Sequence, residues 1–272
     1  MRRKILFHLL MPLLVVLFTS SCDLEKDIEV ELPYHEPQLV VECYLEPGKP
    51  IRALVLESSG YFDELQLPLV PDAEVTISHN GKKFKLDYKP FQAKNTGRFY
   101  THTSSTMMHG KPGDIYSIEV VDAKGRKVTG FTTILEKVPI EKVEWKFNDD
   151  NKAYLLTSFQ DNGDTEDYYR YMTHRDSLNN GSQRDFANTD ALTNGKRISY
   201  GSAYDYEEGD TLIVSLFHIE KQYYDFLSST DDAKDANGNP FAQPSKIRSS
   251  VQGGFGIFTN LAYDRKTVII TK

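Results

Sequence analysis

The stretch AEVTISHNGKKFKL, residues 73–86, decides the fold class of this chain. Apolar and polar residues alternate on both sides of Asn80-Gly81, as they do in half-buried strands. Asn-Gly is the dipeptide that a type I′ hairpin turn favours, because both central residues need a positive φ. The sequence therefore predicts an antiparallel hairpin that buries Val75 and Ile77 on one face and turns the intervening charges toward water.

Similar short segments surround this hairpin, each rich in Val, Ile, Thr and Tyr and bounded by Gly or Pro. About seven such strands in a hundred residues is the spacing of an immunoglobulin-like sandwich. We therefore predict an all-β fold that begins with an N-terminal immunoglobulin-like β-sandwich at residues 38–138. Its strands are expected at 39–45, 51–56, 73–79, 82–86, 97–101, 114–121 and 126–132.

A second all-β domain, sandwich-like or barrel-like, is expected at residues 139–272. Pro139 follows the last predicted strand of the first sandwich, and an aromatic segment around Trp145 opens a new set of strands. Residues 209–219 form an apolar run that suggests a strand buried on both faces, and a short helix is expected near 220–229. The polar residues 176–197 are interpreted as a long mobile insertion.

The N-terminal segment has the layout of a cleaved secretory signal. Residues 1–21 contain a basic start, an apolar core and small residues directly before Cys22. This order resembles the lipobox of bacterial lipoproteins, although Thr19 stands where Leu is usual, and the resemblance implies lipidation of Cys22. Each buried acyl methylene contributes ~0.8 kcal/mol, so two or three chains hold a soluble domain at a membrane. Residues 22–37 are acidic and interrupted by proline, as expected of a tether that lifts the folded part off the membrane.

Charge and cysteine content limit the partners. Without residues 1–21, which carry three of the 32 basic residues and no acidic ones, the net charge is −10. Nucleic acid is a poor partner for such a surface. Cys22 and Cys43 are the two cysteines, and lipidation of the first leaves Cys43 without a disulfide partner. Cys43 lies in an alternating apolar strand, so we expect it to be a small buried side chain.

The sequence carries no motif of a known catalytic centre, so we expect no enzyme activity and no cofactor. The histidines lack zinc-ligand spacing, and His218 is expected to be a hydrogen-bonded core or edge residue. A glycosidase carboxylate pair is a third possibility that only geometry can identify. The acidic segment 161–167 has oxygen donors that suit calcium, but its spacing fits no known loop. We interpret it as a solvated turn and expect no metal site.

Two groups of apolar side chains are candidates for a partner or ligand surface. Tyr61, Phe62 and Leu65 lie in a long apolar loop, which either protrudes toward a partner or folds back over its own sandwich. Aromatic rings stack on sugar rings, so a second group is a candidate glycan site unless it forms cross-strand packing. This second group consists of Tyr200, Tyr204 and Tyr206.

Five segments together resemble a known family. They are residues 39–50 and 70–75, Tyr223-Tyr224-Asp225-Phe226-Leu227, Gly238-Asn239-Pro240-Phe241 with Pro244, and Gly253-Gly254-Phe255-Gly256-Ile257-Phe258. This set is similar to a family of Bacteroidota outer-membrane lipoproteins of unknown function, the domain of unknown function 4249 family. Members are typically encoded next to TonB-dependent receptors. The resemblance assigns no catalytic residue.

These observations lead to one expected function and one alternative. We expect a non-enzymatic lipoprotein of the outer membrane that is lipid-anchored and exposed on the cell surface. Its partners would be the membrane, through the N-terminal lipid, and, by the resemblance, a TonB-dependent receptor for which it is an accessory or binding subunit. The alternative is a free-standing surface module that binds a glycan or a peptide.

Overall fold

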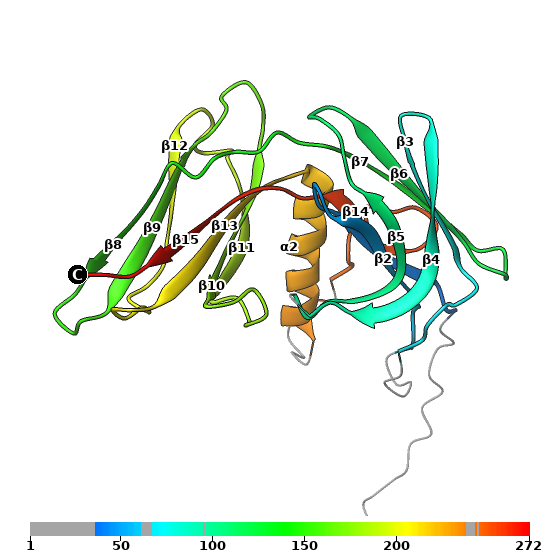
Figure 1. Cartoon of the computed structure of the whole chain (residues 1–272), viewed down its shortest axis with the longest axis horizontal. Coiled ribbons are helices and arrows are strands. Elements are labelled where there is room, and N and C mark those ends of the chain that lie inside the picture. Colours follow the sequence, from blue (N-terminus) through cyan, green and yellow to red (C-terminus); the bar gives the residue numbers. More distant parts are fainter. Residues whose placement is uncertain (1–35, 61–66, 95, 238–242, 244) are drawn as a thin grey trace, which may run out of the picture. The chain divides into compact units, whose positions relative to one another are not determined.

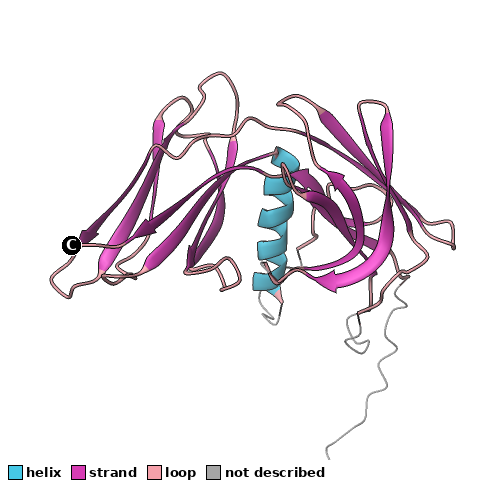
Figure 2. Ribbon diagram, viewed as in Figure 1, coloured by secondary structure: helices cyan, strands magenta, loops and turns pink. Residues whose placement is uncertain are grey.

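Strands make up nearly all the regular structure of the described part of the chain, and α2 (Lys221–Ala236) is the one helix there (Figure 2). The computed structural model describes residues 36–60, 67–94, 96–237, 243 and 245–272 (Figure 1). The all-β prediction is confirmed. The predicted signal, Cys22 and most of the tether lie outside the described residues, as do Tyr61, Phe62 and Leu65.

Eight strands form one continuous sheet that we call the barrel-like sheet. They are β1 (Leu39–Leu45), β2 (Pro50–Glu57), β3 (Glu74–His79), β4 (Lys82–Gln92), β5 (Phe99–Met107), β6 (Ile115–Val121), β7 (Lys127–Thr133) and β14 (Phe255–Asn260). The order across the sheet is β14-β1-β2-β5-β4-β3-β6-β7, and the sheet curls around an aliphatic core. The seven strands predicted within residues 38–138 correspond to β1–β7.

The hairpin formed by β3 and β4 has the predicted register. Val75 pairs with Leu86 and Ile77 with Phe84, and both Val75 and Ile77 are fully buried. The turn residues Asn80 and Gly81 have φ values of 48° and 74°, as a type I′ turn requires. Local sequence thus set both the turn and the buried face of these two strands.

The glycine-rich segment 253–256 brings β14 against the opposite edge of the barrel-like sheet. A Cβ on Gly253 would lie 2.1 Å from the carbonyl oxygen of Lys127 in β7, and a Cβ on Gly256 would lie 2.0 Å from that of Val41 in β1. Gly256 also has a φ of 122°. Only glycine permits so close an approach of two backbones. The segment is therefore a packing device that nearly closes the sheet.

The second half of the chain forms two sheets that face each other, which we call the second sandwich. One sheet has the order β11-β10-β13-β15 and the other β12-β9-β8. The strands are β8 (Lys142–Phe147), β9 (Ala153–Gln160), β10 (Tyr168–Arg175), β11 (Arg184–Thr189), β12 (Arg197–Gly201), β13 (Thr211–Ile219) and β15 (Ala262–Ile269). Trp145 packs at the rim of the aromatic core between these sheets.

Two local predictions for this half are corrected. Residues 176–197 do not form an unstructured insertion, because β11 lies within them and pairs with β10 from Tyr168↔Thr189 to Thr173↔Arg184. The polar residues of β11 show no strand periodicity, and pairing with β10 supplies the partners of its backbone. The helix near 220–229 exists but extends to Ala236, past the apolar residues on which the prediction was based.

Strand β13 is buried on both faces, as its apolar run predicted. Leu212, Val214 and Leu216 face the core of the second sandwich, while Phe217 and Ile219 pack with Tyr223 of α2. The cluster formed by Phe217, Ile219 and Tyr223 also contains Ile257 of β14. Helix α2 therefore lies between the barrel-like sheet and the second sandwich (Figure 1). Residues 36–272 form one compact unit, and β14 belongs to the barrel-like sheet although its sequence follows β13.

Candidate functional site

The tyrosines predicted as a ligand surface have different environments. Tyr200 and Tyr206 are 7% and 0% exposed and belong to the core of the second sandwich, so they form no ligand surface. Cross-strand aromatic packing accounts for them, since Tyr200 contacts Phe159, Tyr171 and Phe186. Tyr204 is 46% exposed and packs edge-on against Tyr154. The structure therefore separates the three residues instead of gathering them.

A pocket of about 320 Å³ opens where the outer face of β10, β13 and β15 meets α2 and the start of β5. We call it the arginine-tyrosine pocket. The loop at 178–182 between β10 and β11 forms part of its rim. The charged, histidine and aromatic side chains around it are Glu46, Arg98, Tyr100, Arg170, His174, Phe217, Tyr223, Tyr263 and Arg265.

The three arginines of this pocket differ in their partners. Arg170 is held by two hydrogen bonds to Asp185, of 2.8 and 2.7 Å, and it also donates to the hydroxyl of Tyr223 at 2.5 Å. Arg98 lies over the ring of Tyr44 at 4.6 Å, and Arg265 lies over the ring of Tyr263 at 4.5 Å. Within the described residues, neither Arg98 nor Arg265 forms an ion pair. Arg265 also donates a hydrogen bond to the Ser215 hydroxyl at 2.8 Å. No described carboxylate neutralises either guanidinium group, so both can still attract an anion.

Two other polar side chains of the pocket, Tyr263 and His174, have pKa values that their surroundings shift. Tyr263 donates a hydrogen bond to Glu46 at 2.6 Å, and burial together with this bond raises the pKa of Tyr263 to about 12. Burial also lowers the pKa of His174, and the charge of Arg265 lowers it further, so the ring is neutral. Glu46 is the one acidic side chain among the described residues that line the pocket. Three arginines beside a single carboxylate give the described lining of the pocket a positive balance.

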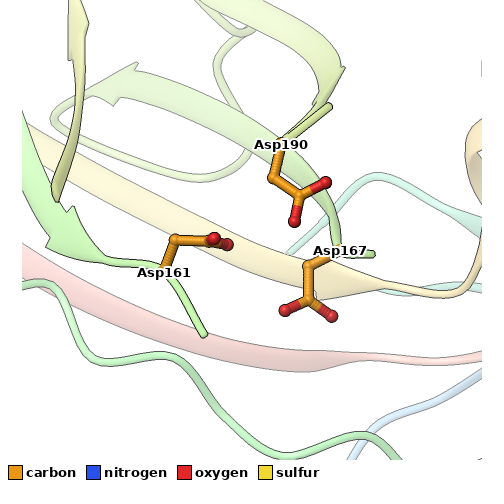
Figure 3. Close-up of side chains that lie close together, drawn as sticks. All are labelled: Asp161, Asp167 and Asp190. Carbon is orange, nitrogen blue, oxygen red and sulfur yellow. The ribbon is translucent and has the colours of Figure 1, made fainter. Parts of the chain in front are cut away.

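A second polar site lies in the second sandwich, where three aspartates meet (Figure 3). Asp161 follows β9, Asp167 precedes β10 and Asp190 follows β11. One carboxylate oxygen from each lies within 4.8 Å of the others, and all three residues are buried. We call this group the aspartate cluster.

Two of the three carboxylates have protein partners. Asp161 accepts hydrogen bonds from the Tyr169 hydroxyl at 2.5 Å and from the Gly195 amide at 2.7 Å. Asp167 accepts one from Thr165 at 2.9 Å and contacts Nε2 of His218 at 3.1 Å. Neither carboxylate oxygen of Asp190 has a hydrogen-bond partner among the described residues, although the side chain is fully buried.

Repulsion between the three carboxylates would destabilise the folded protein unless a positive charge compensates it. Two unit charges less than 4.8 Å apart repel by roughly 3–4 kcal/mol at an effective dielectric constant of about 20. Three such pairs amount to about 10 kcal/mol, which is comparable with the whole stability of a domain. Burial raises the pKa of Asp190, the backbone of Asp167 partly opposes this shift, and the charges of Asp161 and Asp167 raise the pKa further. A proton, a cationic His218 or a bound cation must offset part of this repulsion.

His218 is a hydrogen-bonded histidine, as predicted, and it is oriented by contacts at both ring nitrogens. Nδ1 lies 2.8 Å from the backbone carbonyl oxygen of Glu136, and Nε2 faces Asp167. A carbonyl oxygen only accepts, so Nδ1 carries a hydrogen. The bond between Nε2 and Asp167 then requires a further proton, either on the imidazole or on the carboxylate. Both nitrogens are engaged, so neither is free to bind a metal.

Sequence reasoning predicted neither site. The acidic segment 161–167 was weighed as a calcium turn but interpreted as a solvated turn, which is wrong for Asp161 and Asp167 because both are buried. Asp190 was missed because it stood in the stretch interpreted as a mobile insertion. Arg98, Arg170 and Arg265 were not singled out either. Each lies within one or two residues of a Tyr or Phe in a strand, and an arginine on an otherwise aromatic strand face is a signal that could have identified them.

Comparison with known proteins places the chain in a family. The fold is an all-β combination of a nearly closed sheet and a sandwich. The chain belongs to the family described as "Domain of unknown function (DUF4249)", whose model matches residues 25–267. No curated protein matches the chain.

Among solved structures, a chain titled "Cytokine receptor complex - Crystal form 1A" is 8% identical, with a TM-score of 0.27. The match covers 68% of this chain and 86% of that one. A search of the described residues for a helix long and apolar enough to cross a membrane finds none.

Proposed function

We propose that this protein is a non-enzymatic, lipid-anchored binding protein of the outer membrane that serves as an accessory subunit of a TonB-dependent transporter. The arginine-tyrosine pocket is the observation that carries the binding role. It offers Arg98 and Arg265 without ionic partners beside several aromatic rings, and it contains no carboxylate pair. Guanidinium groups recognise carboxylates, sulfates and phosphates through paired hydrogen bonds. The ligand of the pocket is therefore negatively charged.

The location and the transporter partner have different support. Lipid attachment is supported by residues 1–22, which end in the lipobox-like Thr19-Ser20-Ser21-Cys22. Exposure on the cell surface is supported by the acidic residues that follow Cys22. The TonB-dependent receptor and the Bacteroidota origin are supported by the resemblance of residues 223–227 and 253–258 to lipoproteins encoded beside such receptors.

The partner is tested by affinity purification of the full-length protein from its native membrane in detergent. We expect an outer-membrane β-barrel receptor to copurify, and recovery of the protein alone would contradict the proposal. A double variant, Arg98→Ala with Arg265→Gln, keeps the fold because neither side chain is fully buried. It should still copurify with the receptor if the pocket serves the ligand and not the receptor.

The lipid anchor is tested separately. Metabolic labelling with palmitate should mark the mature protein, and Cys22→Ala should release it from the envelope. Cys43 is the matched control, since Cys43→Ala should leave both labelling and envelope retention unchanged. An unlabelled mature form, or a Cys22→Ala variant that stays in the envelope, would remove the anchor from the proposal.

The same pocket favours a second candidate, a free-standing surface module that binds an acidic glycan or peptide without a transporter. Each charge-assisted hydrogen bond contributes roughly 1.5–3 kcal/mol, so losing Arg98 or Arg265 should weaken binding about tenfold or more. Calorimetry with acidic oligosaccharides and acidic peptides measures this. Arg184→Gln is the control, because Arg184 pairs with Asp205 and does not line the pocket. Binding without copurification of a receptor would favour this second candidate.

A further inference from the structure

The aspartate cluster lacks a protein partner for its most buried member. Asp190 extends toward the space between Asp161 and Asp167 (Figure 3), and both of its carboxylate oxygens lack a hydrogen-bond partner within the described residues. Its side chain is 0% exposed, so bulk water does not solvate these oxygens. Buried carboxylates are ordinarily paired with hydrogen-bond donors or bound to metal ions. An orphan of this kind, aimed at two further carboxylates, points to a missing positive ligand.

We propose that Asp161, Asp167 and Asp190 bind one calcium ion that holds together the loops at this end of the second sandwich. Calcium binds oxygen ligands at 2.3–2.6 Å, so two oxygens on opposite sides of one ion are about 4.8 Å apart. The three carboxylate oxygens lie within that span. Asp161 and Asp167 each keep lone pairs for the ion, because a carboxylate oxygen accepts more than one contact.

The donor set selects calcium over other common ions. Zinc prefers nitrogen and sulfur ligands, but both ring nitrogens of His218 are already hydrogen-bonded. Magnesium requires a near-ideal octahedron and usually keeps several waters, which a fully buried Asp190 leaves little room for. Calcium tolerates irregular geometry and takes carboxylates, backbone carbonyls and a few waters. One further oxygen nearby, the buried hydroxyl of Tyr200, also lacks a partner among the described residues.

The ion would connect segments that are far apart in sequence. Asp161 and Asp167 flank the turn between β9 and β10, while Asp190 starts the turn between β11 and β12. These two turns already touch, since a Cβ on Gly163 would lie 3.0 Å from the Cα of Gly195. The amide of Asp190 also donates to the carbonyl of Asp167 at 3.1 Å. Calcium would thus fasten both sheets of the second sandwich at one end.

The first experiment uses the unmodified full-length protein in detergent. After dialysis against calcium and then against calcium-free buffer, elemental analysis should find about one calcium per chain. Terbium is a calcium mimic, and it should luminesce on tyrosine excitation because Tyr169 donates to Asp161. Calcium, but not magnesium at the same concentration, should quench this signal and raise the midpoint of thermal unfolding. No bound calcium, or equal displacement by magnesium, would overturn the assignment.

The second experiment compares matched variants. Asp190→Asn is isosteric and removes one charge, so calcium affinity should fall on the order of 100-fold or more, because even outer-shell changes cost 10–100-fold. Asp164→Asn is the control, since Asp164 is an exposed acid in the same turn. It should bind calcium as the unmodified protein does.

A proton shared by the aspartates is the competing arrangement, and the same variants distinguish it. If protons alone offset the repulsion, calcium would not stabilise the unmodified protein, and Asp190→Asn would raise its stability equally with calcium or with a chelator. If calcium is the ligand, Asp190→Asn should raise the unfolding midpoint only in the presence of the chelator. The first result overturns the proposal and the second supports it.

Discussion

The interior of the barrel-like sheet is aliphatic, whereas that of the second sandwich is aromatic and rich in hydrogen bonds. Around Val75 and Ile77 the barrel-like sheet packs mainly Leu, Val, Ile and Ala side chains. The second sandwich instead buries Tyr169, Tyr171 and Tyr206, and the last two hydrogen-bond to buried threonines. Both candidate sites draw most of their side chains from the strands and connecting turns of the second sandwich.

The two interiors suggest different roles, with the barrel-like sheet as a scaffold and the second sandwich as the region that carries polar side chains. Aliphatic packing is nondirectional and depends on volume, so the barrel-like sheet is specified by shape and by close backbone contacts. Buried hydroxyls and carboxylates are directional and costly when a partner is lost. The barrel-like sheet therefore holds the chain together. The second sandwich carries the groups that a ligand or an ion can address.

The largest expected effect tests whether the barrel-like sheet depends on backbone closure. Gly256→Ala places a Cβ 2.0 Å from the carbonyl oxygen of Val41 at a φ of 122°. We expect a loss on the order of 3 kcal/mol or more in the free energy of unfolding, because backbone must move. Urea denaturation measures it. The control is Gly201→Ala in the second sandwich, where the nearest contact is an ordinary 3.7 Å and the change should stay within about 1 kcal/mol.

The next effect tests whether buried polar pairs stabilise the second sandwich. Arg170→Met leaves Asp185 and Tyr223 without their guanidinium donor, and the side chain of Arg170 is only 14% exposed. We expect a loss of about 2–3 kcal/mol by urea denaturation, below the 3–5 kcal/mol of a fully buried pair.

Arg184→Met is the comparison for this pair, since the side chains of Arg184 and Asp205 are 37% and 44% exposed, more than that of Arg170. Its cost should be under about 1 kcal/mol. Equal costs for the two variants would mean that burial does not distinguish these ion pairs.

A smaller effect is expected from the buried histidine of the barrel-like sheet. Burial lowers the pKa of His102, which is fully buried and lies 3.0 Å from the carbonyl oxygen of Ala73. The unfolded chain binds a proton below its ordinary pKa of 6.5, whereas the folded chain does not. Stability is therefore complete above pH 6.5 and falls as the pH drops from there through the folded pKa.

His102→Gln should remove this pH dependence and cost about 1 kcal/mol at neutral pH, because one hydrogen bond is weakened. Urea denaturation between neutral and mildly acidic pH measures both. The exposed His109→Gln is the control and should leave the slope unchanged. An unchanged slope in His102→Gln would mean that another group dominates acid unfolding.

The last prediction is that Cys43 and Trp145 report the same unfolding midpoint. Cys43 lies in the barrel-like sheet, and burial raises the pKa of its thiol to about 12, so it should react with thiol reagents only after unfolding. Trp145, the only tryptophan, reports on the second sandwich through its hydrogen bond of 2.7 Å to Thr271. Because β14 ties the two regions together, labelling of Cys43 and fluorescence of Trp145 should share one midpoint. Separate midpoints would show that the regions unfold independently.

Much of the fold could be predicted because its signals are local. The alternation around Asn80-Gly81 was enough for the first hairpin, and the apolar run 209–219 was enough for a strand buried on both faces. The strand β11 was missed because its polar residues show no periodicity, and only pairing with β10 stabilises them. The end of α2 was missed because Asp231, Asp232 and Lys234 face solvent and give no apolar pattern.

The candidate sites depend on contacts that sequence order conceals. Asp161 and Asp190 are separated by two strands, and Arg98 and Arg265 by most of the folded chain. Composition left two interpretations of Tyr200 and Tyr206 open, a ligand surface or cross-strand packing, and both residues lie in the core. A tyrosine has one apolar ring and one hydroxyl, so it suits a core and a surface equally until its neighbours are known.

The sequence by itself determined the strand content and the first hairpin with its register, because turn chemistry and side-chain alternation act over a few residues. Tertiary structure alone decided that β14 returns to the barrel-like sheet, that two arginines face one pocket, and that three carboxylates meet in a buried space. These are long-range juxtapositions, and their energies exist only once the chain has brought distant groups together.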